Sequence, residues 1–460
     1  MDMDPIFKVS ALANFAAAFN LAVTGHILLL LELAGNPATE SETSMLASSA
    51  FVGAIVGQFT FGYFANQIGI EFGLAMALFL CTAGNILAAF LAWKPVQYEV
   101  LSIFRFVVGV GAGGVYPLSA VASAESSDGS NRGRRMMLVF SFQGVGQIAA
   151  PLSVVLLDAI LPNASQAAWR ISLLIGSLPS AYAIPIALTI KSRSERQSRL
   201  CMSSPSSPKP NNGFPTRDYH VAADPHCRRH ERKTCSFANM YLLLGTAGTW
   251  FLFDIVFYGN IIFTPFILEK VFAIDEFHPN KLAIAGYSVI IYLCALPGIY
   301  LSSYVADSWG RKKLQIVGFS ACALIFAFLS VRLHNLSENW LFVLYLLTFF
   351  FYNFGPNSTT FCLPAETFDA NVRTFFNGVS AACGKAGAVV GAAIFKYILD
   401  EHGLSSVVVW CSIICVFGVV LTLVAVVDKR GQSLDDEFDD ELRLDVDDHP
   451  RSSVSELELT

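Results

Sequence analysis

The segment Gly245–Asn260 (GTAGTWFLFDIVFYGN) contains residues whose types and spacing could do chemistry. Trp250, Asp254 and Tyr258 are spaced four residues apart, so on a helix they lie along one face. A bare carboxylate at bilayer depth costs about 2.5–3.5 kcal/mol on insertion scales, so Asp254 should face a protein interior or a watery cavity. An acid between two aromatic residues is typical of a polar-ligand site. The alternative is a structural acid that a neighbouring helix satisfies.

Lys385 is a second charge within an apolar stretch. It lies among small residues in FNGVSAACGKAGAVVGAAIF, too deep to reach water easily, and a buried lysine needs an anion. Together with Asp254 it could bind a tetrahedral oxyanion, because the acid would accept from a protonated oxygen and the ammonium would donate to a charged one. The same two residues could instead form an ion pair that holds helices together. A ligand that inserts into such a pair would satisfy both interpretations.

Other polar residues in apolar stretches are candidate ligand contacts. Tyr116 follows a glycine-rich run, Gln143 lies in FQGVGQ, and Asn357 sits beside Pro356. Helix packing explains Tyr116 or Gln143 as well as ligand contact does. We expect Pro356 and Pro364 to break their helix, which frees backbone groups that a cavity or a neighbour must satisfy.

Arg105 and Glu366 complete the short set of charges at or near membrane depth. Arg105 needs a carbonyl or polar partner, and Glu366 lies near one end of its apolar run. No nucleophile–base pair appears. The Cys and His residues of the 191–236 segment fit no zinc spacing. We therefore expect no enzyme activity, no cofactor and no bound metal.

Membrane helices must position these residues. The 460-residue chain is 54% hydrophobic and 14% charged, against about 25% charged residues in soluble domains. Its apolar runs of spanning length number twelve: 7–33, 46–66, 70–93, 98–122, 136–160, 169–190, 237–268, 282–306, 314–332, 339–364, 374–398 and 404–427. We predict an all-α membrane protein with a six-helix bundle at 1–190, a loop at 191–236, a second six-helix bundle at 237–427 and an acidic tail at 428–460. Two bundles of this kind suggest a central site between them.

The basic residues predict the orientation. The 191–236 loop holds ten Lys/Arg against four Asp/Glu, which places it in the cytoplasm. An even number of spans on each side then puts both termini there. The basic residues that follow spans four and eight agree: Arg132, Arg134, Arg135, Arg311, Lys312 and Lys313. The glycosylation sequons at Asn163 and Asn335 fall in outside loops.

A weak internal repeat relates two inter-span segments. Gly57–Gly69 (GQFTFGYFANQIG) and Gly298–Lys313 (GIYLSSYVADSWGRKK) occupy matching places in the two halves. The second carries Asp307 and Arg311. Together with Arg105 and Glu366, these two are our candidates for gating or structural roles. The first has Asn66 where an acid is expected.

The stretches GTAGTWFLFDIVFYGN, NFGPNSTTFCLPAETF, SAACGKAGAVVGA and GAGGVYPLSAVASAE closely resemble the plant and fungal proton-coupled inorganic phosphate symporters of the major facilitator superfamily. DSWGRKK matches the loop between spans 8 and 9 of that superfamily, and KRGQSLDDEF resembles the family's ending after span 12. The resemblance covers about residues 10–435, apart from the central loop. It implies the major facilitator fold and places the family's phosphate contacts on Tyr116, Gln143, Trp250, Asp254, Tyr258, Asn357 and Lys385.

The chain departs from the family pattern in its first half. The family's FFTDAYDLF motif aligns with NFAAAFNLA, so Ala17 and Asn20 stand where acids are expected, and Val115 replaces an aspartate before Tyr116. The resemblance assigns those acids to proton relay. We therefore predict that anion binding is kept while proton coupling is altered or lost. Asp254 and His26 are the remaining proton-coupling candidates, although a lone histidine in an apolar helix is often just hydrogen-bonded to a neighbour.

We expect a monomeric carrier in a lipid bilayer that moves inorganic phosphate, with protons as a candidate co-substrate and no nucleic-acid partner. The expected location is the plasma membrane, with an endomembrane as the alternative. Two other functions stay open. One is a carrier of organic phosphates such as glycerophosphodiesters, or of other organic anions. The other is a phosphate sensor that does not transport and signals through the 191–236 loop or the tail.

Overall fold

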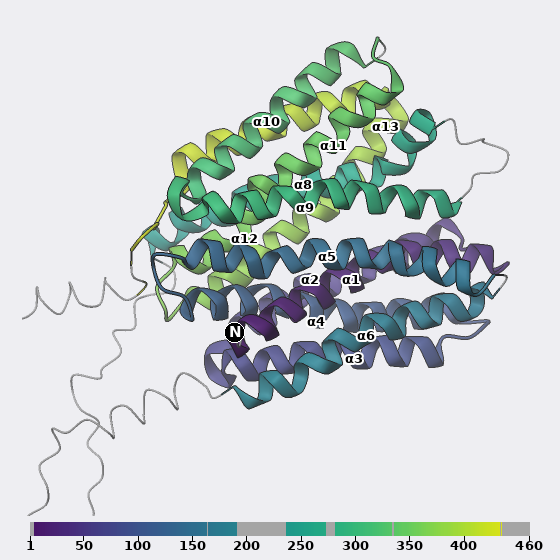
Figure 1. The fold of residues 1–460 in the computed structure, drawn as a ribbon, viewed down its shortest axis with the longest axis horizontal. Coiled ribbons are helices and arrows are strands. Elements are labelled where there is room, and N and C mark those ends of the chain that lie inside the picture. Colours follow the sequence, from purple (N-terminus) through teal and green to yellow (C-terminus); the bar gives the residue numbers. More distant parts are fainter. Residues whose placement is uncertain are drawn as a thin grey trace, which may run out of the picture.

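The computed structural model describes residues 4–162, 164–190, 236–272, 281–333, 335–432 and 434. The regular structure of these residues is helical throughout, as the sequence predicts (Figure 1). The helices of the first half are α1 (Pro5–Leu33), α2 (Glu40–Ile68), α3 (Ile70–Leu91), α4 (Gln97–Glu125), α5 (Arg132–Ile160) and α6 (Ser165–Thr189). Those of the second half are α8 (Phe237–Phe272), α9 (Lys281–Trp309), α10 (Arg311–Arg332), α11 (Glu338–Phe354), α12 (Pro356–Thr367) and α13 (Arg373–Ala425).

In the described residues, eleven helical segments are long and apolar enough to cross a membrane. The twelfth predicted span, 339–364, is divided into α11 and α12 at Gly355. The predicted break at Pro356 is therefore confirmed, because proline can start a helix but cannot continue one without losing a hydrogen bond. Pro364, the second predicted interruption of the hydrogen-bond ladder, does not end its helix. α12 continues through this residue to Thr367, and packing holds the helix because all of its residues are buried.

The last two predicted spans follow one another in α13 and are separated by a kink. The α13 backbone departs from helical geometry at Gly403, where φ is 75°. This left-handed conformation suits glycine, which has no Cβ to clash. On either side, Arg373–Leu399 and Glu401–Ala425 each satisfy the length and composition of a membrane span.

The helices of the two halves lie in two groups, with α1–α6 below and α8–α13 above in Figure 1. The groups meet where α5 packs against α9 and where α2 packs against α13. The predicted domain boundaries stay a prediction, because the central loop up to residue 235 and the tail from 435 lie outside the described residues.

The glycine-rich run of α4 allows close helix packing within the first group. A Cβ added at Gly109 would lie 2.2 Å from the carbonyl oxygen of Ala50, and one at Gly113 would lie 2.2 Å from that of Ala54. Any larger residue would therefore push α2 and α4 apart. Small residues that let backbones approach are typical of helix packing in membranes.

The two ends of the helix assembly differ. We call one end the closed face, where α5 begins at Arg132, α10 begins at Arg311 and the segment 428–432 follows α13. The start of α1 lies there too, since Asp4 pairs with Arg135. We call the opposite end the open face, where α1 ends at Leu33 and α2 begins at Glu40.

Candidate functional site

An ion pair between Asp254 of α8 and Lys385 of α13 forms the centre of the candidate site. The Lys385 ammonium donates to a carboxylate oxygen of Asp254 at 2.9 Å and to the hydroxyl of Tyr258 at 3.1 Å. Asp254 is 1% exposed and Lys385 is 4% exposed, so water barely screens the pair. The prediction that these two side chains converge is confirmed. Removing one partner of such a buried pair strands the other charge and typically costs about 3–5 kcal/mol.

Trp250 of α8 lies next to α13 close to this pair. It lies one helical turn before Asp254 on α8 and is 4% exposed. Its ring packs on α13 at Gly384, where an added Cβ would lie 2.5 Å from the indole Cδ1 atom. The glycine in the CGKAGA stretch therefore makes room for the tryptophan, and the predicted face of Trp250, Asp254 and Tyr258 is confirmed as one surface.

Tyr116 brings the first half of the chain to the same place. Its ring centroid lies 5.7 Å from the Lys385 ammonium, and that of Tyr258 lies 4.6 Å away. A cation over an aromatic ring is stabilised by the ring's negative face. The lysine thus lies near aromatic rings from both groups of helices, as expected of a central site between the two bundles.

Gln143 and Asn357 are buried but are not bonded to the ion pair. The Asn357 amide donates to the side-chain oxygen of Asn353 at 2.8 Å. The side-chain oxygen of Gln143 is buried without a hydrogen-bond partner in the described structure. Their membership of the ligand site stays a prediction.

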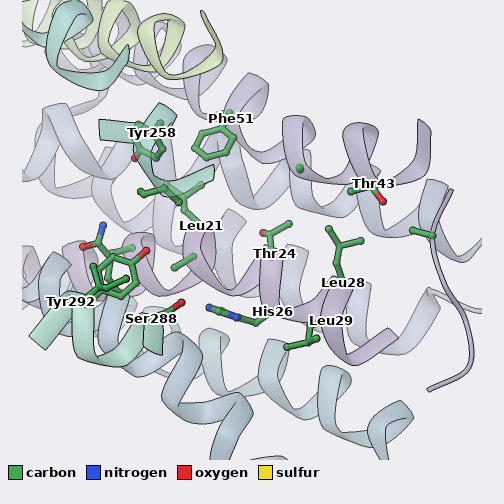
Figure 2. Close-up of a pocket in the computed structure, with 18 of the residues that line it drawn as sticks. Leu21, Thr24, His26, Leu28, Leu29, Thr43, Phe51, Tyr258, Ser288 and Tyr292 are labelled. Atoms are coloured by element: carbon green, nitrogen blue, oxygen red, sulfur yellow. The ribbon is translucent and has the colours of Figure 1, made fainter. Parts of the chain in front are cut away.

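A cavity of about 710 Å³ leads from the site toward the open face. Tyr116 and Tyr258 line its inner end, and it reaches the exposed residues Glu32 and Pro37. Its walls are mostly apolar side chains of α1, α2, α8 and α9. Figure 2 shows His26 of α1 pointing into this cavity beside Ser288 of α9. His26 therefore lies along the access path and not at the ion pair.

The sequence pattern does not single out six further polar residues that line this cavity, namely Thr24, Glu32, Thr43, Gln147, Ser288 and Tyr292. Gln147 lies one helical turn after Gln143 on α5, so the spacing of the FQGVGQ motif could have indicated it. Ser288 and Tyr292 share the same four-residue spacing on α9. The sequence alone does not distinguish Ser288 and Tyr292 from other polar residues of a membrane helix, because it does not tell which face of α9 meets α1.

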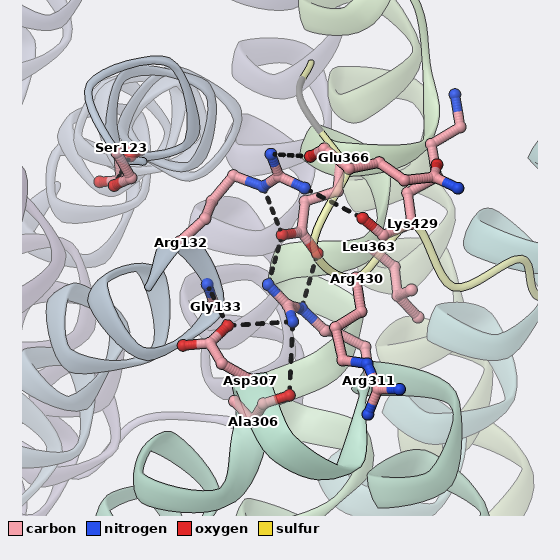
Figure 3. A network of polar contacts seen from close by, with 12 residues as sticks. Ser123, Arg132, Gly133, Ala306, Asp307, Arg311, Leu363, Glu366, Lys429 and Arg430 are labelled. Atoms are coloured by element: carbon pink, nitrogen blue, oxygen red, sulfur yellow. Dashed lines mark hydrogen bonds and ion pairs between the residues drawn. The ribbon is translucent and has the colours of Figure 1, made fainter. Parts of the chain in front are cut away.

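Glu366 joins the two groups at the closed face (Figure 3). It accepts from the Nε atoms of Arg132 at 2.7 Å and of Arg311 at 2.8 Å. Both arginines are fully buried, with 1% or less of each residue exposed. Arg132 also donates to the carbonyl oxygens of Lys429 at 3.2 Å and Gln432 at 3.0 Å, so the segment after α13 takes part in the same network.

Asp307 caps the start of α5 from the other group. It accepts from the backbone N–H groups of Gly133 at 3.0 Å and Arg134 at 2.9 Å. A carboxylate is stabilised at a helix N-terminus, where free N–H groups and the helix dipole are positive. At the matching place of the weak repeat, Asn66 donates to the carbonyl oxygen of Asn371 at 2.8 Å. Both repeat segments therefore connect the two groups of helices, one through the Asp307 carboxylate and the other through the Asn66 amide.

Arg105 lies apart from this network, within the first group. It donates to the carbonyl oxygen of Asn20 at 3.0 Å and to the side-chain oxygen of Asn85. The expectation of a carbonyl or polar partner is confirmed. Asn85 in turn donates to the side-chain oxygen of Asn20 at 2.7 Å. Among the described residues, Arg105 forms no ion pair with a carboxylate.

Comparison with known proteins identifies related sequences over most of the chain. The Major Facilitator Superfamily model matches residues 10–364. A probable inorganic phosphate transporter 1-6 of Arabidopsis thaliana is 31% identical, with 93% of this chain and 92% of that protein aligned. The inorganic phosphate transporter PHO84 of Saccharomyces cerevisiae is 29% identical, with 84% of this chain and 73% of that protein aligned.

A solved structure shares the fold. The proton:xylose symporter XylE bound to 6-bromo-6-deoxy-D-glucose aligns with a TM-score of 0.74 over 94% of this chain and 97% of that one. The two sequences are 17% identical, so the likeness concerns the arrangement of helices. The expected major facilitator fold is confirmed.

Proposed function

Because this chain belongs to the inorganic phosphate transporter family of the Major Facilitator Superfamily, we propose that it carries inorganic phosphate across a membrane by alternating access. The observation that carries this proposal is the buried Asp254–Lys385 pair with two tyrosines at the inner end of a cavity. The protein is then a monomeric carrier of the plasma membrane, with the closed face in the cytoplasm by the charge of its loops.

The chemistry of the pair suits a phosphate monoanion. H2PO4⁻ presents charged oxygens that accept and P–OH groups that donate. It enters between the two side chains, so that Lys385 donates to a charged oxygen and Asp254 accepts from a protonated one. The Tyr116 and Tyr258 hydroxyls supply further donors. Both charges thereby keep a partner while the ligand is bound, which avoids the cost of stranding either.

Alternating access follows from the contrast between the two faces. The cavity reaches the open face, whereas Glu366 and Asp307 hold the groups together at the closed face. Release toward the closed face requires these contacts to break while the open face shuts, as in the rocking of two halves about a fixed midplane site. Asp307, Arg311 and Glu366 are then the gating residues, and Arg105 is structural.

Proton coupling is altered or lost in this proposal. Asn20 occupies the place of a family acid, and its amide bonds to Asn85 beside Arg105, so no titratable carboxyl group is found at that position. Any proton that crosses must travel on Asp254, on His26 or on H2PO4⁻ itself. In proteoliposomes, phosphate uptake should change little when a pH gradient is imposed. A strong dependence on the gradient would contradict this part of the proposal.

The decisive experiment replaces the lysine. Lys385→Ala should abolish phosphate uptake in proteoliposomes while the protein still inserts into the membrane. Uptake at the rate of the unmodified protein would refute the site. Phosphate binding without flux in the unmodified protein would favour the sensor function instead.

The cavity favours one alternative cargo. Its volume of about 710 Å³ lies in the range of roughly 300–1,000 Å³ that is typical of sites for larger organic ligands. An organic phosphate ester could place its phosphate at Lys385 and its organic part against the apolar walls. Competition of labelled phosphate uptake by glycerophosphodiesters separates the two cargoes, because a carrier selective for inorganic phosphate should be unaffected.

A further inference from the structure

Gln58 of α2 is a buried amide without hydrogen bonds. The residue is 0% exposed, and neither its side-chain oxygen nor its side-chain nitrogen has a partner in the described structure. Native proteins satisfy the large majority of their buried polar groups, so a side chain with both atoms unsatisfied calls for an explanation. Its place in the fold supplies one.

Gln58 lies on the face of α2 that meets the second group. Phe51, Gln58, Gly62 and Asn66 follow one another at intervals of seven, four and four residues, so they share one side of the helix. Toward the open face, the Phe51 ring packs edge-on against Tyr258 of the candidate site, with ring centroids 5.4 Å apart. Toward the closed face, the Asn66 amide donates to the carbonyl oxygen of Asn371, in the loop before α13. Gln58 therefore lies about 10 Å below the level of Phe51, between the site and the closed face.

The backbones of α2 and α13 touch at this level and close the path. A Cβ added at Gly378 would lie 2.4 Å from the carbonyl oxygen of Gln58 and 3.0 Å from the Cα atom of Gly62. No water or ion fits between helices at this distance. In the present conformation, Gln58 is therefore a fully buried residue of the α2–α13 contact, which must separate whenever the closed face opens.

We propose that Gln58 is a substrate-contacting residue of the release path toward the closed face. The inference rests on the phosphate transport proposed above. When α2 and α13 separate, the Gln58 amide N–H donates to a charged phosphate oxygen and its carbonyl oxygen accepts from a P–OH group. An amide offers both functions, which match the acceptor and donor groups of H2PO4⁻ leaving Lys385. In the closed conformation, the unsatisfied amide weakens the α2–α13 contact and so eases opening.

The first test compares two buried glutamines by melting temperature in the full-length protein without phosphate. Gln58→Leu removes an unsatisfied amide and should raise the melting temperature by about 2 °C or more. Gln315→Leu is the matched control, because the Gln315 amide donates to Thr422 at 3.0 Å and accepts from Thr359 at 2.7 Å. That variant should lower the melting temperature, since it removes two buried hydrogen bonds between side chains. A fall for both variants would overturn the proposal.

The second test measures transport in proteoliposomes. Gln58→Leu should bind phosphate within about two-fold of the unmodified protein while its phosphate efflux rate falls about ten-fold, which corresponds to the loss of a polar contact. Gln58→Asn keeps an amide and should recover part of the rate. Unchanged efflux in Gln58→Leu, with a raised melting temperature, would show that Gln58 is merely buried and would overturn its role as a contact. Absence of phosphate flux in the unmodified protein would overturn the proposed function itself, and the Gln58 contact with it.

Discussion

The ion pair of Asp254 and Lys385 can have two roles, in stability and in binding, and these roles make different demands. Stability requires that neither charge be left alone in a dry interior. Binding requires both charges, because the ligand must meet a donor and an acceptor. The 2.9 Å contact and the near-complete burial of both residues satisfy the first demand. Variants can separate the two roles.

We predict that Lys385→Met alone destabilises the protein by about 3–5 kcal/mol, because Asp254 keeps a buried charge without its partner. The double variant Asp254→Asn with Lys385→Met should recover most of that stability, since two neutral side chains of similar size need no counter-charge. Neither variant should transport phosphate. Thermal unfolding and proteoliposome uptake measure the two roles. Uptake by the double variant would show that the pair is structural only.

Asn20 offers a second residue-scale prediction, about proton coupling. Asn20→Asp places a carboxylate beside Arg105, where the structure has amide and carbonyl groups. A titratable acid in the first half should make phosphate uptake respond to an imposed pH gradient, with faster uptake when the outside is acidic. The control is Asn14→Asp, one to two turns earlier on α1, where the amide bonds to Ser119. An equal response in both variants, or in neither, would contradict the assignment.

At the scale of elements, the closed face depends on contacts between helix ends. Glu366 at the end of α12 bridges Arg132 at the start of α5 and Arg311 at the start of α10. One carboxylate therefore pairs with two buried guanidinium groups from different groups of helices, and Asp307 supplies a second carboxylate to Arg311 at 3.1 Å. The halves should separate at this face when that charge is removed.

We predict that Glu366→Gln destabilises the closed face and makes the neighbouring Cys362 reactive. Cys362 is a free, buried thiol one helical turn before Glu366 on α12. A membrane-impermeant thiol reagent applied from the closed face should label Cys362 faster in the variant, as quantified by peptide mass spectrometry. Glu42→Gln is the control, because Glu42 forms an exposed capping box with Thr39 at the open face. Equal labelling in the two variants would show that Glu366 does not hold the gate.

At the scale of the whole molecule, orientation decides what the cavity is for. The cavity reaches the open face, and the loop that carries Asn335 between α10 and α11 lies at the same end. If the closed face is cytoplasmic, as the basic residues indicate, the present conformation accepts its ligand from outside. The direction of phosphate movement then follows from which face shuts first after binding.

Glycosylation tests this orientation. In a host that adds N-linked glycans, the exposed Asn335-Leu-Ser337 sequon should be modified, and Asn335→Gln should remove that mass. The sequon at Asn357 is the internal control, because Asn357 is 6% exposed and lies within α12, so it should carry no glycan. If the protein carried no glycan at all in a host that glycosylates a co-expressed control protein, the open face would be assigned to the cytoplasm.

The sequence by itself determined the elements and the set of charges. Span length and apolar composition depend on neighbouring residues along the chain, so the membrane helices, the all-α class and the break at Pro356 could be predicted from local pattern. The face shared by Trp250, Asp254 and Tyr258 follows from helical spacing alone. The rarity of charge in lipid made Arg105, Asp254 and Lys385 stand out without any structure.

Only the tertiary structure decided which of these residues meet. Lys385 and Asp254 are 131 residues apart, and their contact depends on how α8 packs against α13. The same holds for Arg105, whose partners come from α1 and α3. Pro364 stays helical because its surroundings are packed, which a local rule cannot see. The burial of Gln58 is likewise a property of the α2–α13 contact. Contacts between helices depend on shape and burial across the whole assembly, and a linear pattern does not record them.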